Sequence, residues 1–131
     1  MKRRQSPVHY NKALNAYKTV EKTTVSGRET EARVLTEGAS KLRNCQKKWT
    51  DVNRRELLDE ALRYNQRIWT IFQAEIAKED NPLPHAIKLD IFRLSRFVDK
   101  RIFEVLGSPA PEKLDILIKI NENIAAGLRG Q

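Results

Sequence analysis

The sequence predicts an all-α protein, an antiparallel bundle of four main helices with a short helix at the N-terminal end. Apolar residues recur at spacings of three and four, which is the helical period, and no segment alternates between apolar and polar residues as a strand does. The five glycines and five prolines gather at a few points and mark turns. A chain of 131 residues can bury roughly two-thirds of its unfolded surface, so we expect a single domain.

The chain divides into a flexible tail, a short and mobile helix, and the bundle, at residues 1–9, 10–22 and 27–128. Ser26 is followed three residues later by Glu29, which is the pattern of a capping box. This pattern predicts that the second helix begins near Gly27. Its inward residues would be Ala32, Leu35, Ala39, Leu42, Cys45 and Trp49.

A long third helix follows, capped by Thr50 and Asp51 and extending to about Lys78. Asn65 interrupts its apolar stripe, which consists of Leu58, Ala61, Leu62, Ile68, Trp69, Phe72 and Ile76.

The segment Asn81-Pro82-Leu83-Pro84 has two interpretations. It is either a rigid corner with Leu83 packed inward, or an exposed end at which Leu83 and His85 meet a partner.

The fourth and fifth predicted helices complete the bundle. Pro84 suits the first helical position, and Gly107 is a favoured left-handed stop. The inward residues of the fourth helix would be Ile87, Ile91, Leu94, Val98, Ile102 and Val105. The fifth helix, at about 112–128, would bury Leu114, Leu117, Ile118, Ile124, Ala125 and Leu128. Because the connections are short, consecutive helices should run antiparallel.

The fourth helix carries more apolar residues than one inward stripe needs, since Leu89, Phe92, Phe97 and Phe103 lie on its other faces. The first helix is the nearest unassigned apolar surface. We expect it to cover this face in the free protein and to be displaced or joined by a partner segment in a complex. The predicted partner-binding residues are Leu14, Tyr17, Val20, Leu89, Phe92, Arg96 and Phe103.

The sequence shows no sign of catalysis or of metal binding. There is no glycine-rich phosphate loop, no Gly-x-Ser-x-Gly and no His-Glu-x-x-His. His9 and His85 lie far apart, and the single thiol, Cys45, falls on an apolar stripe and is read as a core residue rather than a reactive group. We therefore expect no enzyme activity, no cofactor, no metal and no small-molecule substrate.

The charge is divided unevenly along the chain. Residues 1–50 carry twelve Lys or Arg against four Glu, a net charge of +8, whereas residues 51–131 are neutral. A basic segment attracts polyanions or an acidic protein surface, so contact with nucleic acid and contact with a protein both stay open, beside plain solubility. No apolar run approaches the ~20 residues of a membrane helix, and no apolar core follows Met1-Lys2-Arg3-Arg4, so we expect a cytoplasmic protein.

Three stretches together resemble the flagellar biosynthesis regulator FlaF family of alpha-type proteobacteria. They are Gly27–Leu35, the run from Asn65 through the Ile68-Trp69-Thr70-Ile71-Phe72 segment and the proline-rich turn to Asp99, and Leu117–Leu128. Their order and spacing cover about residues 13–128. The resemblance implies a small helical cytoplasmic protein that is required for flagellin production. It also implies action after transcription, beside a second regulator, FlbT, as a flagellin-binding secretion chaperone.

Two hypotheses for function follow, together with a purely structural role beside FlbT. In the first, the protein binds flagellin, with apolar grooves supplying affinity and the basic half steering the encounter. In the second, a nucleic-acid-binding regulator holds the flagellin message through the basic N-terminal half. Salt separates them, because phosphate contacts weaken steeply with ionic strength and apolar contacts do not.

Overall fold

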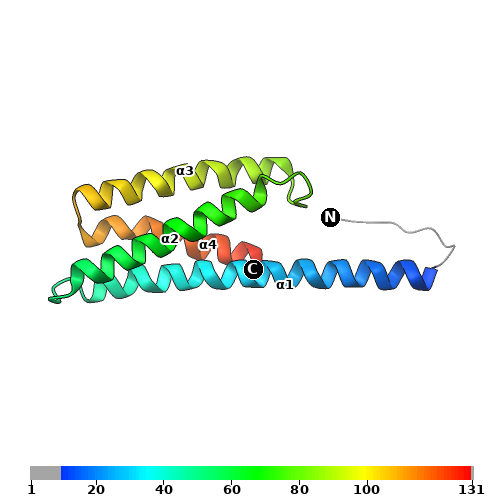
Figure 1. The fold of residues 1–131 in the computed structure, drawn as a ribbon, viewed down its shortest axis with the longest axis horizontal. Coiled ribbons are helices and arrows are strands. Elements are labelled where there is room, and N and C mark those ends of the chain that lie inside the picture. Colours follow the sequence, from blue (N-terminus) through cyan, green and yellow to red (C-terminus); the bar gives the residue numbers. More distant parts are fainter. Residues whose placement is uncertain (1–9, 131) are drawn as a thin grey trace.

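A computed structural model gives the fold of the chain (Figure 1). It describes the backbone of residues 10–130 and the side chains of residues 27–130, and the predicted tail at 1–9 lies outside the described residues. Within 10–130 there is no strand, which confirms the all-α class. The elements are α1 (Tyr10–Lys47), α2 (Arg54–Ile76), α3 (His85–Gly107), the 3₁₀ turn η1 (Pro111–Leu114) and α4 (Asp115–Leu128).

The N-terminal half forms one helix where the sequence predicted two. The backbone of α1 continues through Ser26 and Gly27, so the pattern of Ser26 and Glu29 does not mark a helix start. A glycine inside a helix costs only about 1 kcal/mol relative to alanine, which a continuous helix tolerates. A Cβ added at Gly27 would meet nothing within 4 Å, so no close contact requires a glycine there.

The ends of α3 also differ in detail from the prediction. Pro84 lies just before the helix in extended conformation, with φ −58° and ψ 149°, and α3 begins at His85. Gly107 is the last helical residue rather than a left-handed stop, and the extended Ser108 that follows has φ −151°. The one glycine with positive φ in the described part of the chain is Gly130, at 81°.

The contacts between helices define their directions. Gln46 near the end of α1 contacts Asp115 at the start of α4, whereas Glu29 earlier in α1 contacts Arg129 just after α4, so these helices run in opposite directions. The ion pair of Lys41 with Glu60 and the hydrogen bond of Asn65 to Gly38 give the same relation for α1 and α2.

The long helix α1 lies along α4 and α2, and α3 packs mainly on α2, with a smaller contact to α4 and η1 (Figure 1). On its N-terminal side α1 continues past the ends of the other helices (Figure 1).

The predicted core agrees with the structure in α2, where every residue of the stripe is buried. Trp69 and Phe72 meet edge to face, with ring centroids 5.7 Å apart. In α1 the stripe is buried up to Cys45, whereas Trp49 lies after the helix and is half-buried.

The inward faces of α3 and α4 differ from the prediction at several positions. In α3, Ile87 is 43 % exposed, Leu94 is half-buried, and Ser95 is buried instead. Ile87 lies in the first turn of α3, where the neighbouring helices do not cover it. In α4, Ile120 and Asn121 are buried although they were not predicted to be. Ile124 and Leu128, which were predicted to be buried, are half-buried.

Among the described residues, no helix combines the length and the apolar character that a membrane crossing requires.

Candidate protein-binding surfaces

The outer side of α3 carries a row of apolar and charged side chains, which we call the α3 strip. Leu89 is 40 % exposed, Phe103 78 % and Leu106 56 %. Arg96 is exposed, and Phe92 is half-buried, with one side packed on the core. The strip consists of Leu89, Phe92, Arg96, Asp99, Phe103 and Leu106.

The structure brings the α3 half of the predicted surface together but does not join it to the other half. Leu14, Tyr17 and Val20 lie on the backbone of α1, and their side chains lie outside the described residues. Within the part of the chain that the structure describes, α3 contacts α2, η1 and α4 but not α1. Coverage of α3 by the N-terminal segment therefore stays a prediction.

A small hollow lies at the end of the bundle from which α1 projects, and we call it the end notch. It forms because α2 and α4 stop there, while the chain turns the corner into α3 and α1 continues. Its volume is about 160 Å³, and its floor includes Phe72, Ile76, Leu83 and Leu128. The notch is mixed in character, because the buried Phe72 and Ile76 and the half-buried Leu83 and Leu128 lie beside polar side chains that include Arg28, Glu31 and Glu75.

The corner at Asn81–Pro84 is held by its own hydrogen bonds. The Asn81 side chain accepts a bond of 3.0 Å from the Leu83 N–H and donates one of 3.2 Å to the Glu75 carbonyl. Leu83 is half-buried against the core, and His85 is exposed. These contacts favour the rigid-corner interpretation for Leu83.

The end notch also contains an acidic pair. Burial raises the pKa of Glu31, the nearby Glu75 raises it further, and Arg28 opposes both effects. A carboxylate that is partly removed from water beside a second carboxylate is less stable in its charged form. Filling the notch with an apolar segment would increase that burial.

The interior holds a network of side-chain amides that connects α1, α2 and α4. Asn65 donates bonds of 3.1 Å to the Gly38 carbonyl and 2.8 Å to the Ala61 carbonyl. Asn121 donates bonds of 2.6 Å to Asn65 Oδ1 and 3.2 Å to the Leu35 carbonyl. All of the donors and acceptors lie in the bundle interior.

Trp69 completes this network, since its indole N–H donates a bond of 2.9 Å to Asn121 Oδ1. Both amide side chains are 1 % exposed, and both of their oxygens and nitrogens are hydrogen-bonded. Sequence reasoning identified Asn65 only as an interruption of a stripe. The available signal was that Asn65 and Asn121 both occupy positions that the helical period turns inward.

Cys45 is buried as predicted, at 1 % exposure. Burial raises the pKa of its thiol, and Glu60 adds to the increase. A high pKa and lack of access both disfavour thiolate chemistry. Among the described residues there is no group of three or more His, Cys, Asp or Glu side chains that could hold a metal ion.

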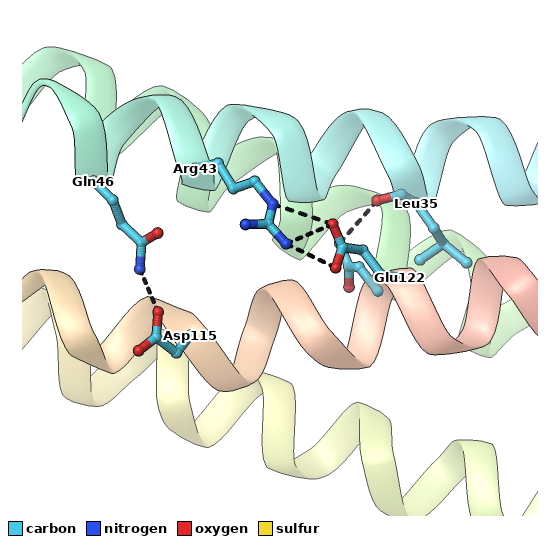
Figure 2. Close-up of polar contacts among 6 residues, drawn as sticks. Leu35, Arg43, Gln46, Asp115 and Glu122 are labelled. Atoms are coloured by element: carbon cyan, nitrogen blue, oxygen red, sulfur yellow. Dashed lines mark hydrogen bonds and ion pairs between the residues drawn. The ribbon is translucent and has the colours of Figure 1, made fainter.

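Part of the basic N-terminal half is neutralised by the fold (Figure 2). Arg43 of α1 donates bonds of 2.9 to 3.1 Å to both carboxylate oxygens of Glu122 in α4. Lys41 lies 3.7 Å from a carboxylate oxygen of Glu60 in α2. Gln46 bonds to Asp115 at 2.7 Å further along the same seam. Because Arg43 and Lys41 have carboxylate partners, they contribute less to the positive field around the protein than a count of basic residues in the sequence indicates.

A comparison with protein families gives the chain a family. The family model described as flagellar protein FlaF matches residues 13–128. The chain belongs to the FlaF family. The match spans α2, α3 and α4 completely and all but the first three residues of α1, so the end notch, the amide network and the α3 strip all lie within the FlaF region. No curated protein and no solved structure matches the chain.

Proposed function

We propose that this FlaF-family protein binds flagellin in the cytoplasm as a secretion chaperone and thereby regulates flagellin synthesis after transcription. The family places the chain in flagellar biology. Action beside the regulator FlbT is part of the same proposal.

The observation that carries the proposal is the length of α1. This helix has 38 residues against 23 in α2 and 14 in α4, and it runs past the ends of its neighbours (Figure 1). An isolated helix of about 15 residues is marginal in water, because most helical stability in proteins comes from packing of an apolar face. The projecting part of α1 thus favours a protein partner that packs along it.

A flagellin segment would supply the missing neighbour as one more amphipathic helix. It would lie along the projecting part of α1, where Leu14, Tyr17 and Val20 recur at helical spacing in the sequence. Its end would enter the notch beside Phe72, Ile76 and Leu83. This is the helix-in-groove mode of recognition, in which apolar anchors repeat every three or four residues.

Direct binding of the flagellin message is the alternative. The pairing of Lys41 and Arg43 with acids of the fold argues against it, since those cations already have carboxylate partners. RNA binding is therefore an outcome to be tested rather than a second proposal.

The test compares two substitutions in the full chain, at neighbouring positions, each of which adds one carboxylate. Leu14→Asp adds a carboxylate within the proposed apolar series, and Asn15→Asp adds the same charge outside it. Flagellin affinity is measured by calorimetry at low and high salt. We expect Leu14→Asp to weaken binding at least tenfold, Asn15→Asp to change it little, and salt to have a small effect. Equal loss in both variants contradicts this site.

The same preparations are offered the flagellin message as RNA. Steep loss of RNA affinity with rising salt, together with no binding of flagellin, would establish the nucleic-acid alternative instead.

A further inference from the structure

The residues of the α3 strip follow a heptad. Their spacing is three, four, three, four and three from Leu89 through Phe92, Arg96, Asp99 and Phe103 to Leu106. Such a row forms one continuous seam along a helix and is the pattern by which two helices pack together. It is separate from the buried row of Ile91, Ser95, Val98, Ile102 and Val105, which faces the bundle.

The apolar positions of the strip have the same order in both directions, and the two central positions carry opposite charges. Reading inward from its two ends, leucine matches leucine, phenylalanine matches phenylalanine, and the two central positions are arginine and aspartate. The midpoint falls between Phe97 and Val98. A twofold axis crossing α3 at that midpoint would place Leu89 opposite Leu106, Phe92 opposite Phe103, and Arg96 opposite Asp99 of a second copy.

The two central charges have no partner within the described part of the chain. Neighbouring arginines of α3 with the same spacing to an acid are paired, Arg93 with Asp90 at 3.3 Å and Arg101 with Glu104 at 3.0 Å. Arg96 and Asp99 are exposed and take part in no ion pair or hydrogen bond among residues 27–130. Both charges are therefore available to another molecule.

The charges also decide the direction of packing. In a parallel pair in register, Arg96 would face Arg96 and Asp99 would face Asp99, and such like-charge contacts oppose association. In an antiparallel pair each arginine faces an aspartate, twice over by symmetry. The apolar positions at both ends of the strip are then covered as well.

We propose that α3 packs antiparallel against α3 of a second copy of this chain, forming a twofold-symmetric dimer. The interface is isologous, so it closes on itself and does not propagate into a filament. With 23 residues, α3 is about 35 Å long, and two Phe92–Phe103 contacts provide its apolar anchors. The dimer goes beyond flagellin binding and does not depend on it, because the end notch and the projecting part of α1 stay free.

The first test is charge reversal in the full-length protein, with the association state measured by sedimentation over a range of concentrations. We expect the wild type to dimerise and the single variants R96D and D99R each to raise the dimer Kd at least tenfold, because like charges then meet across the axis. The double variant R96D/D99R restores opposite charges and should return the Kd to near the wild-type value. Helical content and melting temperature are recorded for each variant as a control for folding.

The second test reports direction. A spin label attached at His85→Cys, near the start of α3, should lie about 35 to 40 Å from its copy in an antiparallel pair and within about 15 Å in a parallel one. Cys45 is buried, so labelling favours the introduced thiol.

A wild type that stays monomeric overturns the proposal, and so does a double variant that dimerises no better than the single ones. Flagellin binding is measured on the same proteins and distinguishes the two proposals. Variant D99R, at a residue outside the predicted partner-binding set, should bind flagellin as the wild type does. Monomeric wild type together with loss of flagellin binding in R96D would assign the strip to flagellin and refute the dimer.

Discussion

The three helices α1, α2 and α4 are joined differently from α3. The three share a buried amide network in which Asn65, Asn121 and Trp69 bond to each other and to carbonyl groups of α1 and α2. Helix α3 buries the hydroxyl of Ser95, whose Oγ has no hydrogen-bond partner among the described residues. Hydrogen bonds are directional, so the buried network defines the register of α1, α2 and α4. Helix α3 is held mainly by shape and apolar contact, with one part-buried bond near its C-terminal end, from Arg101 to the Lys113 carbonyl of η1 at 3.1 Å.

This difference assigns stability mainly to α1, α2 and α4, and leaves α3 to bind another molecule. An amide network inside a bundle is favourable only when every member is satisfied, and it then selects a single arrangement of the helices that share it. Helix α3 has no part in that network and lies at the edge of the bundle (Figure 1). Its outer side is consequently open to change, and the self-complementary strip lies there.

The largest effect should come from Gly38, where α1 passes the amides most closely. A Cβ at this position would lie 2.5 Å from Asn65 Oδ1 and 2.9 Å from Asn121 Nδ2. Neither amide can move away without breaking its hydrogen bonds, so Gly38→Ala should lower the free energy of unfolding by about 3 kcal/mol or more. Urea denaturation followed by circular dichroism measures this change.

Gly127 in α4 is the matched control, because a Cβ added there meets nothing within 4 Å. Gly127→Ala should stabilise the protein by up to about 1 kcal/mol through helix propensity. Equal stability of Gly38→Ala and wild type would show that α1 and the network can separate at little cost.

A pair of alanine substitutions tests the comparison between the two regions directly. Asn121→Ala leaves the Trp69 N–H, Asn65 Oδ1 and the Leu35 carbonyl without their partner, and should cost about 3 kcal/mol. Ser95→Ala removes a buried hydroxyl that has no partner in the part of the chain that the structure describes, and should leave the stability unchanged or raise it by up to about 1 kcal/mol.

The two values are read from the same denaturation experiment. If Ser95→Ala destabilises as much as Asn121→Ala does, then α3 depends on a directional contact like those of the other helices, and the distinction is wrong.

Sequence periodicity predicted most of the core because burial repeats with the turn of the helix. Every stripe residue of α2 is buried, from Leu58 to Ile76, and Cys45 is in the core. Periodicity failed at the ends of helices, where burial depends on the reach of the neighbouring helices and not on the local pattern. Ile87 has the right phase for burial but lies in the first turn of α3, beyond the cover of its neighbours, and Trp49 follows the end of α1.

The amide network and the single long α1 were not predictable from local pattern. Asparagine at inward positions is unfavourable unless partners from other helices meet it, and those partners lie 52 to 86 residues from Asn121 in the sequence. Ser26 and Glu29 satisfy the capping pattern, but this pattern only supplies partners for a helix start and does not break a helix that has already begun, so α1 continues through it. The α3 half of the candidate surface was predictable, since its excess of apolar residues is visible in one helix alone.

The smallest expected effect concerns the end notch, where the carboxylates of Glu31 in α1 and Glu75 in α2 lie close to each other. The pKa of Glu31 is raised above its ordinary value of 4.5 by burial and then by Glu75, so the folded protein binds this proton more tightly than the unfolded chain does. Stability therefore falls as pH rises from 4.5 through the folded-state pKa, and the penalty is fully present above that value.

Glu31→Gln removes the charge and should raise the melting temperature slightly at neutral pH, by an amount that shrinks to nothing as the pH approaches 4.5. Glu79→Gln, at an exposed position that forms no ion pair among the described residues, is the control and should show no such trend. A Glu31→Gln variant that melts below the wild type at neutral pH, by an amount that vanishes as the pH falls, would mean that this carboxylate stabilises the fold, with Arg28 outweighing both burial and Glu75.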